Sequence, residues 1–584
     1  MIWRRRGNAV AVEQGPRPPG AWRARALLGL MLVTAGAVLA RAFYLQVVDD
    51  QFLTAQGNKR FIRTEVLQAH RGAILDRHGE TLALSAPVDS IWAVPDDLLA
   101  SPQYLPALAK LLEQPLPRLK AYLRARRERQ FVYLVRQVDP AGARRFLALG
   151  APGLFAQHDY RRYYPAGEVA AQVIGFCNID GDGQEGIELA DNRQLAGRPG
   201  RRRVIRDSRD RVVEDAAQYQ AARPGQDLRL TIDLPLQYVA YRELKRAVEE
   251  HHARAGVIVI ADARNGQILA LASQPGYNPN RQDDRASAGV RDRALTDVFE
   301  PGSTIKPLLI ATALNHRVVD AGTRIETDPG TFEVGSLTVH DVHSNGVVDL
   351  AKLLQKSSNV GAAKVGLMMG PQMIWRGYQA FGIGQPLSID LPGAADGVLR
   401  PWTDWGQIAT ATAAYGYGLS VNALQLLRAY SVLADDGLMP QLHIRADVPP
   451  VPPQRVIPAA IARQLRQMLT GVVSDQGTAA LAAVPGYSVA GKTGTSRIAA
   501  DGGYVQGEYR ALFAGMLPAQ QPRLVGVVVI DDPKGMDYYG GSVSGPVFSR
   551  VMRSAARMLQ VAPDQIPAGV PTRTATLEAV RGHS

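Results

Sequence analysis

The sequence of 584 residues contains a single cysteine, Cys177, so no disulfide can form within the chain. One thiol cannot supply a cysteine-based metal site either, although a lone cysteine does not exclude an oxidising compartment. The fold must therefore be held together by packing. A chain of this length can bury the cores of two or three domains.

The chain also has only a modest excess of positive over negative charge. Charged residues make up 21% of the chain and hydrophobic residues 46%, and both shares are ordinary for globular protein. The formal net charge of +12 suits anionic lipid, nucleic acid or an acidic polymer, so charge alone does not choose among these partners.

Long apolar runs are scarce, and the clearest one lies near the amino terminus. An apolar run at 26–40 follows six arginines and continues to Val48. This pattern predicts one transmembrane helix at 25–48 and a cytoplasmic tail at 1–24 on its basic side. A cleaved signal peptide is the alternative, because Ala40-Arg41-Ala42 resembles a small-x-small cleavage site. Under either interpretation, most of the chain lies outside the cytoplasm.

One segment imitates a nucleotide-binding loop. Residues 486–493, GYSVAGKT, fit the phosphate-loop pattern, and Asp531 follows at the end of a later apolar run. A phosphate loop requires a strand before it and the amino terminus of a helix after it. Here segment 461–473 has a helical pattern, and no helix starts after Lys492. The sequence instead predicts that Lys492 lies on the first strand of a three-strand antiparallel meander.

Other local patterns predict the elements around this meander. DLRLTID and the segment after it indicate a strand leading into a long amphipathic helix, and Asn265-Gly266 indicates a β-hairpin turn. A polar helix is expected around 116–129. The arginine-rich segment 197–213 favours an exposed hairpin, with contact to lipid headgroups or another protein as the alternative.

A serine and a lysine are placed together by the segment 299–307, FEPGSTIKP. Ser303 begins an apolar helix, and Lys306 follows three positions later on the same helical face. Pro307 falls in the first turn, where its missing N–H costs no helical bond. A serine hydroxyl needs an adjacent base, and burial at a helix amino terminus would lower the pKa of Lys306 toward that role. Taken alone, this pattern more often means a capping serine and a solvated lysine.

A second pair, Ser357 and Asn359, lies in a break between two helical stretches, so both side chains could project into a cleft. Ser357 could relay a proton, and the Asn359 amide could bind a substrate carbonyl. By itself S-x-N indicates only a turn or a cap.

The third element is the segment 492–495, KTGT. Lys492 would supply positive charge, and the hydroxyls of Thr493 and Thr495 could hold a substrate carboxylate. Gly494 would let an extended peptide approach the strand edge. Each of the three signals is weak alone, but together and in this order they are specific.

The motifs S-x-x-K, S-x-N and K-T-G form the pattern of penicillin-binding proteins and serine β-lactamases. The chain further resembles class B penicillin-binding proteins of the division-specific kind, from about residue 22 to 560. Five more segments carry this resemblance: RGAILDRHGETLA (71–83), RRYYPAGEVAAQVIGF (161–176), GQEGIEL (183–189), AYGYGLSVNALQL (414–426) and IDDPKGMDYYGGSVSGPVF (530–548). One departure is Ser358 in the middle of S-x-N, where related β-lactamases often carry aspartate.

The resemblance implies an α/β (α+β) fold in three parts. A penicillin-binding, β-lactamase-like transpeptidase domain with an antiparallel sheet and flanking helices is expected at 226–565. A mixed α+β pedestal domain of the dimerisation type is expected at 49–225, between the membrane helix and the catalytic domain. A flexible tail is expected at 566–584.

The resemblance also implies a reaction: cross-linking of peptidoglycan stem pentapeptides through an acyl-serine intermediate during septal wall synthesis, with β-lactams as trapped inhibitors. Ser303 would be the nucleophile and Lys306 its base. Ser357 and Lys492 would pass a proton to the leaving group, and the N–H groups of Ser303 and Thr495 would form the oxyanion hole. An elongation-type transpeptidase, a D,D-carboxypeptidase and a penicillin-binding sensor or structural protein are the alternatives.

No cofactor, metal or nucleic-acid partner is expected. His340 and His343 would point to opposite faces of a strand, which disfavours a shared metal. No glycosyltransferase signature and no general-base glutamate for hydrolysis of an acyl-enzyme are recognised. The expected partners are therefore stem peptides on lipid-linked or nascent glycan strands, a membrane glycosyltransferase and other division proteins. The expected location is the bacterial inner membrane at the septum, with the catalytic domain in the periplasm.

Overall fold

The computed structural model describes residues 21–48, 62–206, 212–500, 503–535 and 537–565. Most of the predicted cytoplasmic tail and the whole predicted tail at 566–584 lie outside these residues. The chain divides into two compact units, the first made of Met1–Leu67 and Pro199–Ala222, the second of Gln68–Arg198 and Arg223–Ser584. Each unit is described by itself.

The first unit contains a long apolar helix and a small antiparallel sheet. Its elements are α1 (Ala21–Phe43), the π-helical turn η1 (Tyr44–Val48), and the strands β1 (Ile62–Leu67), β6 (Gly200–Arg206) and β7 (Val212–Gln220). Among the described residues, Trp22–Gln46 is the one helix long and apolar enough to cross a membrane. The pairing of β6 with β7 confirms the hairpin predicted for the arginine-rich segment. The tip of that hairpin lies outside the described residues.

The second unit begins with a lobe built on the long strand β3. Its strands are β2 (Ile74–Leu75), β3 (Thr81–Ala93), β4 (Val132–Val138), β5 (Leu154–Tyr163) and β8 (Leu228–Arg229). Its helices are α3 (Pro95–Ala100), α4 (Leu105–Leu111), α5 (Leu116–Arg124), α6 (Pro140–Leu147), η3 (Gly167–Ala170), α7 (Ala171–Ile174), α8 (Gly186–Ala190) and α9 (Asn192–Leu195). The helix predicted around 116–129 thus ends at Arg124. A core that includes Ile91, Leu98, Leu119 and Phe146 joins helices and strands.

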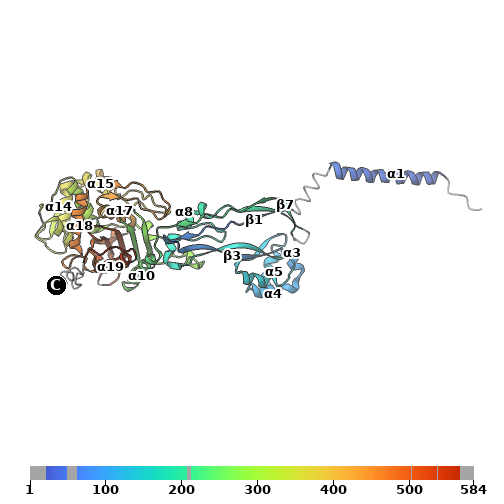
Figure 1. Cartoon of the computed structure of the whole chain (residues 1–584), viewed down its shortest axis with the longest axis horizontal. Coiled ribbons are helices and arrows are strands. Elements are labelled where there is room, and N and C mark those ends of the chain that lie inside the picture. The colour runs from blue at the N-terminus through green and yellow to red at the C-terminus, as the bar shows by residue number, and fades with distance from the viewer. Residues whose placement is uncertain (1–20, 49–61, 207–211, 501–502, 536, 566–584) are drawn as a thin grey trace, which may run out of the picture. The chain divides into compact units, whose positions relative to one another are not determined.

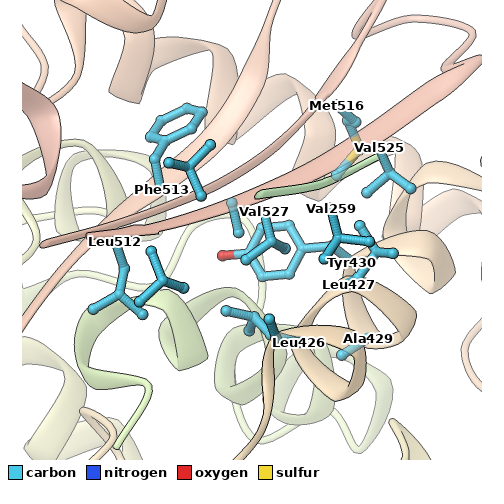
Figure 2. Close-up of a cluster of buried hydrophobic side chains, with 14 of the residues drawn as sticks. Val259, Leu426, Leu427, Ala429, Tyr430, Leu512, Phe513, Met516, Val525 and Val527 are labelled. Carbon is cyan, nitrogen blue, oxygen red and sulfur yellow. The ribbon is translucent and has the colours of Figure 1, made fainter. Parts of the chain in front are cut away.

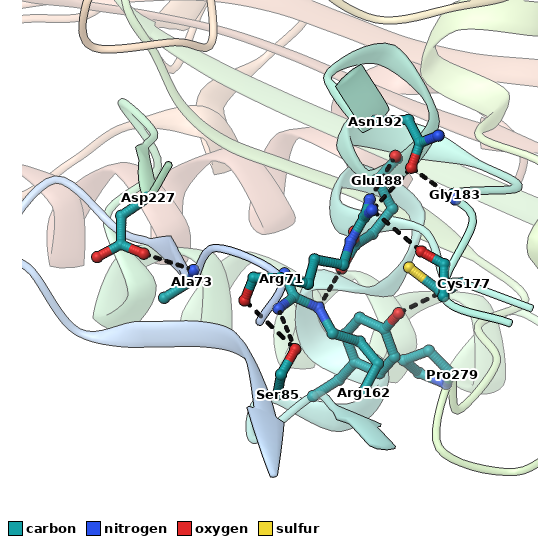
Figure 3. Close-up of polar contacts among 12 residues, drawn as sticks. Arg71, Ala73, Ser85, Arg162, Cys177, Gly183, Glu188, Asn192, Asp227 and Pro279 are labelled. Atoms are coloured by element: carbon teal, nitrogen blue, oxygen red, sulfur yellow. Dashed lines mark hydrogen bonds and ion pairs between the residues drawn. The ribbon is translucent and has the colours of Figure 1, made fainter. Parts of the chain in front are cut away.

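A buried carboxylate organises this lobe. Glu188 is fully buried and accepts a hydrogen bond from Arg71 Nε at 2.7 Å and from Arg162 Nε at 2.6 Å (Figure 3). Arg71 also donates to Asn192 Oδ1 at 2.7 Å, which ties α9 to the strand region. Both guanidinium groups are themselves buried, and within the described residues Glu188 is the one carboxylate that pairs with them.

The larger part of the second unit is built on a five-stranded antiparallel sheet in the order β10-β9-β19-β18-β17. The strands are β9 (Ala255–Asp262), β10 (Ile268–Gln274), β17 (Ala490–Ala500), β18 (Gly503–Leu517) and β19 (Leu524–Asp531). The predicted Asn265-Gly266 hairpin and the predicted meander are both confirmed. Lys492 lies within β17, and Asp531 ends β19, so the phosphate-loop interpretation fails on geometry.

Helices cover both faces of this sheet, and its strands β9 and β19 are buried along their whole length. The flanking elements are α10 (Leu234–Glu250), η4 (Asp283–Ala286), η5 (Ala288–Val290), α11 (Arg293–Thr296), η6 (Gly302–Ile305), α12 (Lys306–Asn315), α13 (Leu350–Lys356), α14 (Asn359–Met369), α15 (Pro371–Ala380), η7 (Trp402–Asp404), α16 (Gln407–Ala413), α17 (Ala423–Ala434), α18 (Ala459–Thr470), η8 (Gly471–Val473), η9 (Ala480–Ala482) and α19 (Gly540–Met558). Short strands complete the unit: β11 (Ile325–Glu326), β12 (Thr331–Val334), β13 (Leu337–His340), β14 (Val347–Val348), β15 (Leu438–Met439) and β16 (Gln454–Arg455). The helices α10 and α19 pack together and against the sheet (Figure 1).

The opposite face of the sheet packs on α17, and strand register decides which side chains meet there. Val527 pairs with Ala514 and Val259, so side chains at alternate positions of three strands share one face. That face surrounds the fully buried Tyr430 of α17 (Figure 2). Lys492 pairs with Ala514 and therefore projects from this same face of the edge strand β17.

Candidate active site

The predicted nucleophile lies in a tight turn rather than in an α-helix. Ser303 belongs to the 3-10 turn η6, which runs into α12 at Lys306, and Pro307 occupies the first turn of α12 as predicted. The N–H of Gly302 donates to Gly416 O at 3.1 Å, so a neighbouring loop supports the turn. Within the described residues, the hydroxyl of Ser303 makes no hydrogen bond and the side chain is only half-buried. It is therefore free to meet a substrate.

The glycine of K-T-G has a clear packing role. A Cβ added at Gly494 would lie 2.9 Å from Thr304 Cγ2 and 3.0 Å from Pro301 O, both in the nucleophile turn. Contacts that short are not tolerated in packed proteins. Gly494 thus lets η6 lie directly against β17. Its predicted role in admitting a peptide to the strand edge stays a prediction.

Lys306 is fully buried, and its amine is held by short hydrogen bonds. Its Nζ lies 2.6 Å from Ser357 O, 2.8 Å from Asn359 Oδ1 and 3.3 Å from Ser357 Oγ. Burial lowers the pKa of Lys306 to about 7, against an opposing influence of the Asp341 carboxylate. A neutral amine has two N–H donors, which match the two shortest contacts, and its lone pair is left to take a proton.

Lys492 is the second buried amine at the same hydroxyl. Its Nζ lies 2.9 Å from Ser357 Oγ and 3.2 Å from Thr493 Oγ1. Burial, and then the neighbouring Lys306, hold the pKa of Lys492 well below its usual range. Two ammonium groups on one hydroxyl repel each other, so the pair favours a state in which at least one amine is neutral. Ser357 thus links two groups that can exchange a proton.

The S-x-N break has the geometry that the sequence predicted. Ser357 ends α13 in the left-handed conformation, with φ of 59°, and Ser358 caps α14, whose first residue is Asn359. The Asn359 amide accepts from Lys306 and donates from Nδ2 to His340 O at 3.0 Å. The left-handed turn aims Ser357 and Asn359 at the same amine.

One functional residue was missed by sequence reasoning. The Asp341 carboxylate accepts hydrogen bonds from Ser358 Oγ and from the N–H groups of Asn359 and Val360, and thereby fixes the start of α14. Its one signal in the sequence is its place between His340 and His343. His340 ends β13, and its backbone carbonyl accepts the hydrogen bond from the Asn359 amide.

The two threonines of KTGT lie on the other face of β17 from Lys492 by strand register. The hydroxyl of Thr493 lies 2.9 Å from that of Thr478, and Thr495 Oγ1 accepts from Gly540 N at 3.2 Å. Thr478 was not singled out from the sequence, because a threonine in a loop carries no pattern. Thr493 Oγ1 also lies 3.2 Å from Lys492 Nζ. The binding of a substrate carboxylate by the hydroxyls of Thr493 and Thr495 stays a prediction.

The structure therefore brings together two buried lysines, a bridging hydroxyl and a carboxamide. Lys306 directly follows the turn that carries the half-buried Ser303. A hydroxyl on a turn next to an amine with a lowered pKa is the arrangement of a serine enzyme that works through an acyl intermediate. The class of protein that this site indicates is a serine acyltransferase of the penicillin-recognising kind.

Comparison with known proteins places the chain within that class. Residues 256–553 match the family model described as the penicillin binding protein transpeptidase domain, and residues 66–230 match the penicillin-binding protein dimerisation domain. The chain belongs to the penicillin-binding protein transpeptidase family.

Several curated relatives are similar along nearly the whole chain. The probable peptidoglycan D,D-transpeptidase PbpC of Pseudomonas aeruginosa is 42% identical, over 92% of this chain and 95% of the relative. The peptidoglycan D,D-transpeptidase FtsI of Escherichia coli strain K12 is 39% identical, over 94% of each protein.

Solved structures agree with this assignment. A peptidoglycan synthetase from Bifidobacterium adolescentis matches with a TM-score of 0.70 and 27% identity, over 86% of this chain and 98% of that structure. The apo transpeptidase domain of Burkholderia pseudomallei penicillin-binding protein 3 matches with a TM-score of 0.53 and 42% identity, over 58% of this chain and 98% of that structure.

Proposed function

We propose that this protein is a division-type peptidoglycan D,D-transpeptidase with Ser303 as nucleophile. The observation that carries the proposal is the contact of Lys306 and Lys492 with one hydroxyl, Ser357 Oγ, at 3.3 and 2.9 Å. The substrate is a stem pentapeptide that ends in D-alanyl-D-alanine, and the terminal carboxylate binds the hydroxyls of Thr493 and Thr495.

In the first half-reaction, Ser303 Oγ bonds to the penultimate D-alanine carbonyl while Lys306 takes its proton. The backbone N–H groups of Ser303 and Thr495 stabilise the oxyanion, and each such donor is worth about 3 kcal/mol. The C–N bond then breaks, and the leaving D-alanine amine takes a proton from Ser357, which Lys492 replenishes. In the second half-reaction, an amine of a neighbouring stem attacks the acyl-enzyme, forms the cross-link and returns the serine hydroxyl.

Gel labelling with fluorescent penicillin tests the site. We expect wild-type protein to be labelled and Ser303→Ala protein to be unlabelled at equal thermal stability. Cross-link formation from a pentapeptide donor must be measured as well, because labelling does not separate a transpeptidase from a sensor. Release of D-alanine without cross-links would indicate a carboxypeptidase, and labelling without turnover would indicate a sensor.

The cellular role that we propose is septal wall synthesis. An amino-terminal helix anchors the protein in the inner membrane, and the catalytic domain works in the periplasm beside a membrane glycosyltransferase and other division proteins. The apolar helix α1 and the similarity to FtsI support this role. Depletion should give filamentous cells, and a fluorescent fusion should collect at the septum; round cells would instead indicate elongation.

We also propose boundaries for the two domains outside the membrane. We place the pedestal at 49–225 and the transpeptidase domain at 226–565, with the family-model matches at 66–230 and 256–553 in support.

A further inference from the structure

A carboxylate stands beside the nucleophile turn without a cationic partner. Glu300 precedes Ser303 by three residues, and its Oε1 accepts from Gly418 N at 2.8 Å and from Tyr504 OH at 3.1 Å. The same loop that carries Gly418 supports the nucleophile turn through Gly416. Glu300 therefore lies where the nucleophile turn, this loop and the start of β18 meet.

The second oxygen of this carboxylate is unused. Glu300 Oε2 is shielded from solvent and has no hydrogen-bond partner within the described part of the chain. None of the lysines, arginines or histidines described by the structure forms an ion pair with Glu300. Arg510, whose charge acts on Glu300, donates to Asp531 at 2.6 Å instead. A buried acceptor without a donor is costly, and such a group in a native protein calls for a functional explanation.

The phenol of Tyr504 lies against the Glu300 carboxylate. Tyr504 keeps 47% of its surface exposed, and its hydroxyl is the one side-chain donor to Glu300 among the described residues. Its ring centre lies 5.8 Å from that of Tyr417, which lies 5.7 Å from that of Tyr415. Carboxylate and aromatic faces together form an environment that attracts a cation. The Tyr504 hydroxyl therefore occupies the position at Glu300 in which a positively charged hydrogen-bond donor would bind.

We propose that Glu300 is the anionic half of a subsite for a primary ammonium group of a peptidoglycan stem peptide, which enters in place of the Tyr504 hydroxyl. The inference rests on the proposed function, because that function supplies amine-bearing peptides as substrates. An ammonium group supplies the missing positive charge and more than one N–H donor, so both carboxylate oxygens gain partners. Glu300 is then a specificity residue, and acylation by penicillins that carry no amine does not depend on it.

The test compares wild-type protein with Glu300→Gln, which keeps the size of the side chain and an acceptor for Gly418 N. The matched control is Glu508→Gln, because Glu508 lies on the same strand β18 but faces Arg254, 3.6 Å away. A second variant, Tyr504→Phe, removes the covering hydroxyl and keeps the carboxylate. Acylation by benzylpenicillin and thermal melting are measured for all four proteins.

The amine could belong to the donor stem peptide or to the acceptor stem peptide, and the experiment has one arm for each. In the donor arm, acylation by a soluble pentapeptide is compared with acylation by the same peptide after acetylation of its side-chain amine. In the acceptor arm, a thioester donor without an amine forms the acyl-enzyme, and aminolysis by an amine-bearing peptide is compared with hydrolysis. In at least one arm, Glu300→Gln should reduce the amine-dependent rate tenfold or more, on the order expected for a charged hydrogen bond. Glu508→Gln and Tyr504→Phe should keep the preference for the amine.

A loss confined to the donor arm assigns the subsite to the donor stem, and a loss confined to the acceptor arm assigns it to the acceptor; both support the proposal. Equal rates for Glu300→Gln and wild type in both arms overturn it. So does an equal loss with free amine, acetylated amine and benzylpenicillin, because that pattern indicates a structural role. In contrast, the proposed function itself would fail if wild-type protein were not acylated by penicillin or formed no cross-links.

Discussion

The hydroxyl of Tyr430 donates to the carbonyl of Thr304 at 2.8 Å and so connects the centre of the hydrophobic core to the nucleophile turn. Tyr430 is fully buried on α17 among the side chains shown in Figure 2. The hydrophobic core thereby holds the turn that carries Ser303 in place.

Loss of this hydroxyl should lower stability and also slow acylation. We expect Tyr430→Phe to cost about 1–3 kcal/mol of stability, because Thr304 O loses a buried donor. The acylation rate with fluorescent penicillin should fall several-fold, since the turn is less well positioned. Tyr277→Phe is the matched control, because Tyr277 is equally buried and donates to Ala171 O at 3.0 Å, away from the turn. Equal acylation rates in the two variants would contradict a positioning role.

The low pKa of Lys306 predicts the pH dependence of acylation. With a pKa of about 7, the amine becomes the neutral base as the pH rises through 7, so the acylation rate should rise there and level off above pH 8. Lys306→Arg keeps the charge but cannot give up its proton, and the rate should fall about 10²–10⁴-fold. Stopped-flow acylation by a chromogenic β-lactam measures both effects. A flat profile between pH 6 and 8 would remove Lys306 from the role of base.

Asp292 should make stability depend on pH. Burial raises the pKa of Asp292 to about 6, even though Ala294 N and Ser273 Oγ donate to its Oδ1. Because the folded state holds this proton more tightly than the unfolded state, the contribution of Asp292 to stability is greatest below pH 4. It is lost as the pH rises toward and through 6, and the whole shift corresponds to ~3 kcal/mol.

The variant Asp292→Asn removes this titration. The stability difference between wild type and variant should change by ~1.4 kcal/mol between pH 5 and pH 8, with wild type relatively more stable at pH 5. Thermal melting of both proteins at the two pH values measures it. A difference that is the same at both pH values would show that Asp292 does not titrate in this range.

The ion pair with Glu188 makes Arg162 differ from its sequence neighbour Arg161. Arg162→Ala should destabilise the protein by ~3–5 kcal/mol, since Arg162 is buried on Glu188, whereas Arg161→Ala should change stability by less than about 0.5 kcal/mol, since Arg161 is exposed. Urea unfolding of the two variants provides the measurement. Comparable losses would mean that the buried ion pair is not what holds this lobe.

Penicillin labelling of the same variants extends the test to function. We also expect the pedestal to control activity. Arg71 and Arg162 are both buried on Glu188, whereas Arg161 is exposed, so a substitution at Arg162 perturbs the pedestal more than one at Arg161. If folded Arg162→Ala protein is labelled but does not support division, the pedestal controls activity without being part of the catalytic site. Normal division would remove that control.

The sequence by itself determined the elements and the residue types of the site. The Asn265-Gly266 turn predicted the hairpin, and the absence of a helix start after Lys492 predicted the meander, because both signals are local. The order of S-x-x-K, S-x-N and K-T-G was enough to predict which side chains meet, through resemblance to a known family. The phosphate-loop pattern could be rejected from sequence as well, since the surrounding segments did not fit it.

Only the tertiary structure decided how these residues are tuned. The pKa values of Lys306 and Lys492 follow from burial and from each other, and both depend on elements far apart in the sequence. Asp341, Thr478 and Glu300 gained their positions from long-range packing, for which a single sequence carries no periodic signal. Likewise, Arg161 and Arg162 look alike in sequence, and the alternation of faces along β5 decides which of them is buried.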